Sequence, residues 1–227
     1  MAAGVHAEVY DLRDGLNGVV NEAGQSIRET AQEASILILR DVADRFATHN
    51  VAATGIGGVD AVFLELLALN WDSKALMKGK VCNKKARWNL CFAGFSQEPD
   101  YDAGKGRVYD FQTVPCLNSI REKLGQCFGP KGNLAVAEGN YYYDKTKCYI
   151  GGHGDAERRI VIAFRFGASM PLEYQWFQRS APLGVQMVFK INHNDCYLMS
   201  SKSVGHDWKQ KIIPTLRHSA NGGAAKK

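Results

Sequence analysis

The stretch from residue 150 to residue 166 reads Ile-Gly-Gly-His-Gly-Asp-Ala-Glu-Arg-Arg-Ile-Val-Ile-Ala-Phe-Arg-Phe. Its second half, Ile160 to Phe166, is a short and nearly continuous apolar run, which predicts a β-strand. Its first half places His153 and Asp155 two residues apart. Because side chains on one side of a strand recur at every second residue, these two can point at one ion.

Strand patterns continue after this stretch. Apolar residues alternate with polar ones in two segments: Leu172, Tyr174 and Trp176, and then Val185, Met187, Phe189 and Ile191. Short strands at this spacing favour a sandwich or barrel. Residues 25 to 47 instead carry apolar residues at helical spacings, although Ser35 to Leu39 within them could form a short strand. We therefore expect an α+β protein with a mostly β core and supporting N-terminal helices.

Length and composition set the domain organisation that we expect. The 227 residues fit one domain with an N-terminal extension. We expect a helical extension over residues 1–70, a β domain over 71–220 and a disordered tail over 221–227. No apolar run reaches the roughly 20 residues of a membrane span, and no secretory signal is visible. We expect a monomer without a membrane partner, located inside the cell, in the nucleus or cytoplasm, with its six cysteines reduced.

A third ligand would complete a metal site at His153 and Asp155. His206 follows 53 residues after His153. Two histidines and one carboxylate hold Fe(II) on one side and leave coordination positions open. Spacing alone leaves two alternatives open, because His193-Asn-Asp195 has the same pattern and His218 is another possible third ligand.

The segment from Tyr141 to Arg159 resembles a conserved stretch of AlkB-like dioxygenases, a branch of the Fe(II)/2-oxoglutarate-dependent superfamily. That stretch runs Asn-x-Tyr, several residues, Ile-Gly-x-His-x-Asp and then an acidic residue. Upstream, Lys85-Ala-Arg87 ahead of aromatic residues and Val114-Pro115 ahead of a helix look like further family segments in the same order. The resemblance covers about residues 80 to 218.

The resemblance implies a double-stranded β-helix, also called a jelly-roll, with Fe(II) held by His153, Asp155 and His206. It implies that Tyr143 hydrogen-bonds 2-oxoglutarate. Tyr141 stands where the family usually has an asparagine that also touches this co-substrate.

The distal carboxylate of 2-oxoglutarate calls for a cation, and Arg217 matches the arginine that provides it. A planar guanidinium can bind a carboxylate through two parallel hydrogen bonds. The AlkB branch normally has a second arginine six residues later, where this chain has Gly223. One arginine would have to suffice, as in other branches of the superfamily.

The substrate residues follow from the same resemblance. Glu157 matches an acidic residue beside the extruded base, although it could equally be a solvated partner of Arg158 or Arg159. Tyr142 and Trp208 could stack on a flipped base, as could Tyr141 and Trp88.

Positive charge is concentrated upstream. Between Asp72 and Glu98 there are six basic residues and no acidic ones. Lys84, Lys85 and Arg87 belong to this run, which is either a solvated loop or a phosphate-binding patch.

The activity that we expect is oxidation of a methyl group on a DNA or RNA base, as in AlkB-like demethylation or methylcytosine oxidation. The alternative is a 2-oxoglutarate-dependent hydroxylase of a protein side chain or a small molecule. A non-catalytic binding protein that kept the fold is a third possibility.

Overall fold

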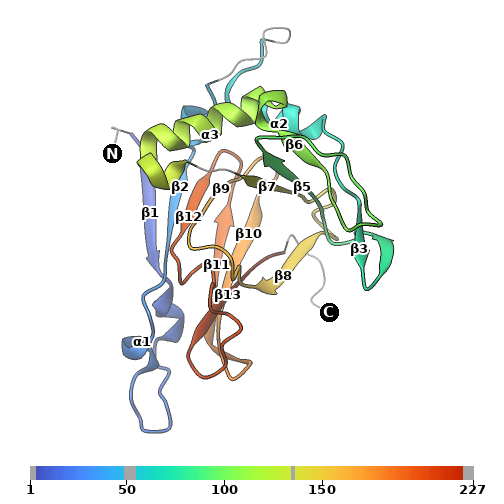
Figure 1. Cartoon of the computed structure of the whole chain (residues 1–227). Coiled ribbons are helices and arrows are strands. Elements are labelled where there is room, and N and C mark those ends of the chain that lie inside the picture. Colours follow the sequence, from blue (N-terminus) through green and yellow to red (C-terminus); the bar gives the residue numbers. More distant parts are fainter. Residues whose placement is uncertain (1–3, 49–54, 134–135, 222–227) are drawn as a thin grey trace. The chain divides into compact units, whose positions relative to one another are not determined.

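The computed structural model describes residues 4–48, 55–133 and 136–221 (Figure 1). These residues form two compact units. Unit 1 contains residues 4–41 and 149–221, and unit 2 contains residues 42–48, 55–133 and 136–148. The chain therefore leaves unit 1 after its first strands and returns to it for the last third.

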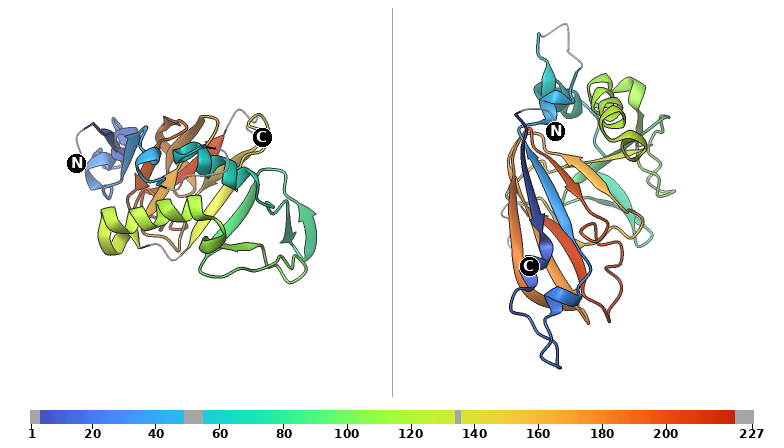
Figure 2. Two further views of the ribbon diagram at one scale, coloured as in Figure 1. Left: turned by 90° about the horizontal axis from the view of Figure 1, so that it is seen from above. Right: turned by 90° about the vertical axis from the view of Figure 1, so that its left-hand side faces the viewer.

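Unit 1 has two four-stranded antiparallel sheets. The first has the order β1, β2, β12, β9, with bounds His6–Asp11, Ser35–Arg40, Cys196–Met199 and Val161–Phe164. The second has the order β11, β10, β13, β8, with bounds Ala181–Ile191, Met170–Gln178, Thr215–Asn221 and Tyr149–His153. The long strands of unit 1 lie along roughly one common axis (Figure 2, right).

One hydrophobic core joins the two sheets of unit 1. Ile36 and Ile38 of β2 belong to the same buried cluster as Tyr174 and Trp176 of β10 and Leu216 of β13. The strand alternation predicted for Leu172, Tyr174 and Trp176 is confirmed, because all three are at most 5% exposed. Short helices η1 (Leu12–Leu16) and α1 (Ile27–Thr30) add further residues to this core.

The prediction of a helical extension over residues 1–70 differs from the structure. Residues 4–41 instead contribute β1 and β2 to the first sheet of unit 1, and the helical stripe predicted over residues 25–47 is interrupted by β2. The alternative strand over Ser35 to Leu39 is the one that forms. This strand pairs with β1 and β12, and its β-branched Ile36 and Ile38 are buried in the core of unit 1, a packing that outweighs the helical spacing. The predicted tail, 221–227, lies outside the described residues except for Asn221, which ends β13.

Unit 2 combines helices with two small sheets. A hairpin joins β3 (Lys74–Met77) to β4 (Lys80–Asn83), and a second sheet has the order β6, β5, β7. The three strands of that sheet are Val108–Asp110, Trp88–Ala93 and Ala137–Tyr141. The helices are η2 (Ala43–Arg45), α2 (Gly58–Leu67), η3 (Phe111–Thr113), α3 (Pro115–Phe128) and η4 (Gly129–Gly132).

The prediction of a mostly β core is confirmed. No helix among the described residues is long and apolar enough to pass through a membrane.

Candidate metal centre

Three ligand-type side chains meet at the edge of the second sheet of unit 1. His153 ends β8 and pairs directly with His218 of β13, and their ring centroids are 4.4 Å apart. Asp155 follows two residues later, with its Oδ1 3.6 Å from Nε2 of His153. One ligand atom from each of the three residues lies within 4.8 Å of the others. Two imidazoles and one carboxylate at this separation can share a single metal ion.

The environment of His218 suits a metal ligand. His218 is 7% exposed, and its Nδ1 has no hydrogen-bond partner among the described residues. Burial, together with the nearby charges of His153 and Arg158, lowers the pKa of His218 to about 3. The imidazole is therefore neutral at physiological pH, which is the form that coordinates metals. A buried nitrogen without a partner is costly unless something binds it, so this site fits a cation.

His153 and Asp155 are held by their own neighbours. Nδ1 of His153 lies 2.8 Å from the carbonyl oxygen of Gly151, and a carbonyl can only accept, so Nδ1 donates and Nε2 keeps its lone pair. The backbone N–H of Asp155 donates to the carbonyl of Val204 at 3.0 Å, and Arg158 donates to Oδ2 of Asp155 at 3.2 Å. These contacts leave one nitrogen of His153 free to face Asp155.

The structure brings together two of the three predicted iron ligands. His206 lies in the turn between β12 and β13, where its Nδ1 is 2.8 Å from the carbonyl oxygen of Ser201. It does not belong to the group at His153, whose third member is His218. Only the pairing register of β8 and β13 puts His218 opposite His153, and sequence spacing does not reveal that register.

Arg217 occupies the other face of β13 from His218, because neighbouring residues of a strand alternate. Leu216 and His218 are buried toward the core, whereas the Arg217 guanidinium lies 4.0 Å from the ring centre of Phe177 and 5.4 Å from that of Trp208. Nε of Arg217 is buried without a hydrogen-bond partner among the described residues. Arg217 therefore keeps one open donor, but not on the face that carries His218.

The remaining predicted residues are divided between the two units. Glu157 is exposed in unit 1. Tyr141, Tyr142 and Tyr143 belong to unit 2, where Tyr141 and Tyr143 pack against Trp88 with centroid distances of 5.9 and 4.6 Å. The hydroxyl of Tyr143 donates to the carbonyl of Lys85.

The three predicted phosphate-binding residues differ in how exposed they are and in whether their charged groups are already hydrogen-bonded. Lys84 is half-buried and its Nζ donates to Oδ1 of Asn89 at 2.6 Å, and burial lowers the pKa of Lys84. Nε of Arg87 donates to Oδ1 of Asn140 at 2.6 Å. Lys85 is exposed, so of the three it offers the most accessible charge.

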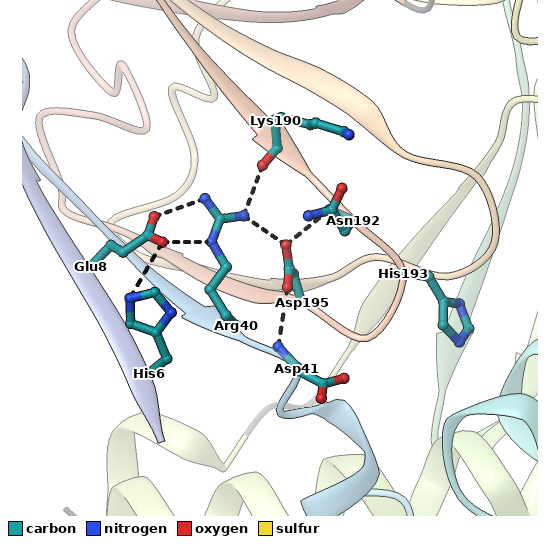
Figure 3. Close-up of a pocket in the computed structure, with 8 residues that line it drawn as sticks. All are labelled: His6, Glu8, Arg40, Asp41, Lys190, Asn192, His193 and Asp195. Atoms are coloured by element: carbon teal, nitrogen blue, oxygen red, sulfur yellow. Dashed lines mark hydrogen bonds and ion pairs between the residues drawn. The ribbon is translucent and has the colours of Figure 1, made fainter. Parts of the chain in front are cut away.

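The second His-x-Asp pattern lies in a shallow pocket at the edge of the first sheet (Figure 3). Asp195 accepts hydrogen bonds from Arg40 and from the backbone of Asp41 and Asn192. His193 is turned away from Asp195 (Figure 3). Its Nδ1 accepts a hydrogen bond from the backbone N–H of Gly167. Asp195 therefore stabilises the fold, and His193 and Asp195 do not converge on one ion.

Comparisons with known proteins add one relative. No family model matches the chain. A protein of Acanthamoeba polyphaga mimivirus, described as uncharacterized, is 53% identical over 160 residues, which are 70% of this chain. The matched part spans 62% of the length of that viral protein.

Proposed function

We propose that the protein is an Fe(II)- and 2-oxoglutarate-dependent dioxygenase that oxidises a methyl group on a nucleic-acid base. The observation that carries this proposal is the convergence of His153, Asp155 and His218 on one point. The two packed sheets of unit 1 support a jelly-roll arrangement around such a centre. The resemblance of residues 80–218 to AlkB-like dioxygenases supplies the choice of metal and co-substrate.

In this proposal the chain's own residues hold and orient the metal. His153 contributes Nε2, since its Nδ1 is engaged by Gly151, and His218 contributes a neutral imidazole. Asp155 supplies the carboxylate and is oriented by Arg158. Fe(II), when bound to such a set, couples the decarboxylation of 2-oxoglutarate to oxidation of a C–H bond by dioxygen.

The co-substrate carboxylate has two candidate partners. Arg217 has an open Nε but faces away from His218. The guanidinium of Arg158 already lies beside the His–Asp–His group, through its contact with Asp155. We therefore propose Arg158 as a second candidate for the carboxylate, beside the Arg217 that the resemblance implies.

The proposal of a nucleic-acid substrate draws its support from unit 2. The exposed Lys85 accepts a hydrogen bond from the Tyr143 hydroxyl at its carbonyl, and the exposed Tyr143 ring packs on the half-buried Trp88 at an angle of 31°. Exposed aromatic rings stack on bases and cationic side chains bind phosphates, so this surface has both chemistries that single-stranded nucleic acid requires. Glu157, exposed in unit 1, remains the candidate for contacting a base edge.

The decisive experiment measures Fe(II) binding and then succinate formation from 2-oxoglutarate, with methylated DNA and RNA oligonucleotides as substrates and unmethylated ones as controls. We expect succinate to increase with a methylated oligonucleotide and product mass to change accordingly. Metal binding without nucleic-acid stimulation would favour the protein or small-molecule hydroxylase. Absence of metal binding would exclude the dioxygenase.

A further inference from the structure

The turn over residues 201–209, between β12 and β13, contacts the candidate metal centre directly. The carbonyl of Val204 accepts the backbone hydrogen bond of Asp155 at 3.0 Å. Gly205 packs on Gly154 so closely that a Cβ at Gly154 would collide with the Gly205 carbonyl and lie 2.7 Å from the Trp208 Cβ. The position of Asp155 therefore depends on the position of this turn.

A buried ion pair spans the same turn. The side chains of Lys202 and Asp207 are 1% and 4% exposed, and Nζ of Lys202 donates to Oδ2 of Asp207 at 2.6 Å. Nζ also donates to the carbonyl of Pro214, at 2.7 Å, just before β13 begins. The pair thus links the two halves of the turn to each other and to the chain entering β13.

This pair is poorly suited to stabilising the fold alone. Oδ1 of Asp207 is buried without a hydrogen-bond partner among the described residues. Burying two charges is costly, and a partly satisfied pair is commonly no more stable than apolar residues of similar size. The pair instead holds the two halves of the turn in a fixed orientation.

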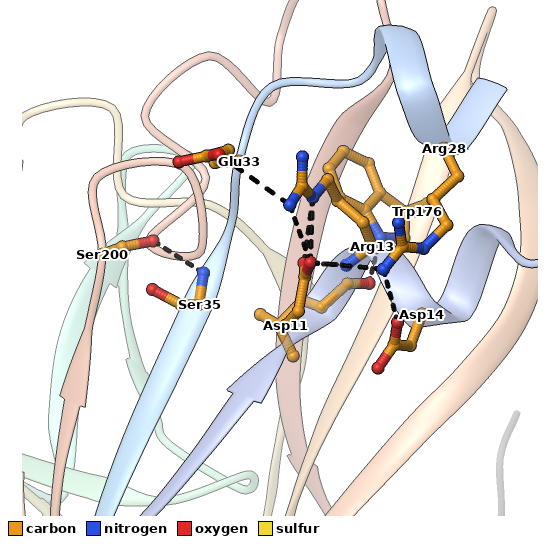
Figure 4. Close-up of polar contacts among 9 residues, drawn as sticks. Asp11, Arg13, Asp14, Arg28, Glu33, Ser35, Trp176 and Ser200 are labelled. Carbon is orange, nitrogen blue, oxygen red and sulfur yellow. Dashed lines mark hydrogen bonds and ion pairs between the residues drawn. The ribbon is translucent and has the colours of Figure 1, made fainter.

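The near end of the turn has a separate anchor. The backbone N–H of Ser35 in β2 donates to Oγ of Ser200 at 3.0 Å (Figure 4), and Oγ of Ser203 donates to the Ser35 carbonyl at 2.9 Å. These serines fix the turn up to residue 203. Val204 is held by its buried side chain and by its N–H, which donates to the Ser200 carbonyl at 2.9 Å. The segment from Gly205 to Trp208, which packs on Gly154, lies beyond these anchors and is bridged by Lys202 and Asp207.

We propose that the buried Lys202–Asp207 pair is a positioning device for the metal centre. It fixes the segment from Gly205 to Trp208 against Gly154, and together with the bond from the Asp155 N–H to the Val204 carbonyl this places the Asp155 carboxylate toward His153 and His218. The part that concerns metal affinity rests on the proposed function, whereas the part that concerns the position of Asp155 does not.

The test uses the full chain and two readouts. Lys202→Met leaves Asp207 unpaired, and Lys202→Met with Asp207→Leu removes both charges while keeping an apolar interior. The dissociation constant of Co(II), as a spectroscopic substitute for Fe(II), measures the metal site. Hydrogen exchange of the Asp155 amide measures its bond to Val204 without any metal. Glu8→Gln disrupts another ion pair of unit 1, remote from the turn in sequence, and is the matched control.

We expect the double variant to regain thermal stability lost in Lys202→Met, since no unpaired charge remains. Its Co(II) dissociation constant should still be raised about 10- to 100-fold, as is typical of lost outer-shell partners, and the Asp155 amide should exchange faster. Glu8→Gln should leave both readouts unchanged. If the double variant does not fold, Asp207→Asn replaces it and should shift both readouts in the same direction.

Wild-type values for Asp155 exchange and Co(II) affinity in the Lys202 variants would overturn the proposal. Failure of the wild-type protein to bind Co(II) or Fe(II) would instead remove the proposed function. In that case the hydrogen-exchange rate of the Asp155 amide would still show whether the Lys202–Asp207 pair positions Asp155.

Discussion

The candidate functional residues of units 1 and 2 differ in their burial. In unit 1, His218 is 7% exposed and Lys202 is 2% exposed, and both lie between or beside packed strands. In unit 2, Lys85 is exposed and Tyr143 is 37% exposed. Buried and fixed groups suit a small ligand that demands exact geometry, such as a metal ion. Exposed cations and aromatic rings suit a large partner bound at many points.

This difference predicts that the two activities can be separated by mutation. Changes at the His–Asp–His group should affect metal binding and leave oligonucleotide affinity nearly intact. Changes at the basic and aromatic residues of unit 2 should do the reverse.

The largest effect is expected at the third ligand of the metal centre. His218→Ala should weaken Co(II) binding by at least about 100-fold, because losing a direct ligand exceeds the 10–100-fold cost of an outer-shell partner. His193→Ala is the control and should bind as the wild type does, since its Nδ1 is bonded to Gly167. Calorimetric titration of each variant measures this. Loss of binding in His206→Ala with normal binding in His218→Ala would instead support the triad implied by the family resemblance.

Much of the candidate site could be anticipated from the sequence because it depends on local spacing. His153 and Asp155 are two residues apart, so their closeness follows from local sequence, although Asp155 lies just beyond the end of β8. The third ligand could not be anticipated in this way. His218 reaches His153 through a strand pairing over 65 residues, and a shift of one residue would place Arg217 there instead.

The same dependence on contacts between distant residues explains why the N-terminal segment was predicted to be helical. Ile38 fits both a helical stripe and a strand in isolation, and its burial in the core of unit 1, with β2 paired between β1 and β12, decides between them. The strands β10 and β11 were anticipated because their alternation is long and unbroken by such ambiguity. The ion pair of Lys202 and Asp207 gave no signal, since two charged residues in a polar turn are normally exposed.

The second prediction concerns the co-substrate and compares two arginines of unit 1. Removing the partner of a desolvated carboxylate costs about 2–5 kcal/mol. Substituting the arginine that binds the carboxylate should therefore raise the KM for 2-oxoglutarate by at least about 30-fold. We expect Arg158→Ala to produce this increase if the carboxylate binds beside His218. An increase in Arg217→Ala alone would place the co-substrate on the opposite face of β13. Steady-state kinetics at saturating Fe(II) distinguishes the two.

The third prediction concerns unit 2 and the salt dependence of oligonucleotide binding. Each phosphate contact contributes about −0.9 to the slope of log K against log salt for duplex DNA. Lys85→Ser should make the slope less steep by about 0.9, the contribution of one phosphate contact. Lys84→Ser should change the slope less, because Nζ of Lys84 is held by Asn89. Co(II) affinity, measured alongside, should stay at the wild-type value in both variants. Equal slopes in wild-type and variant proteins would remove this segment from the binding surface.

The smallest effect is expected in the dependence of stability on pH, where one carboxylate of each unit can be compared. The hydrogen bonds from Arg40 lower the pKa of Glu8 to about 2, and those from Lys147 and Thr146 lower the pKa of Asp144 to about 2. A depressed pKa adds stability above the unfolded value, and this stability is lost as the pH falls from about 4 toward 2.

The two carboxylates differ in what they connect. Glu8 of β1 pairs with Arg40 of β2, 32 residues away, whereas Asp144 pairs with Lys147, three residues away. A local contact can persist in the unfolded chain and then contributes less to the difference between states. Urea unfolding at pH 6 and pH 3 should therefore show a smaller loss of stability in Glu8→Gln than in the wild type. Asp144→Asn should follow the wild-type loss more closely. The reverse order would mean that the turn at Asp144, and not the first sheet of unit 1, limits stability in acid.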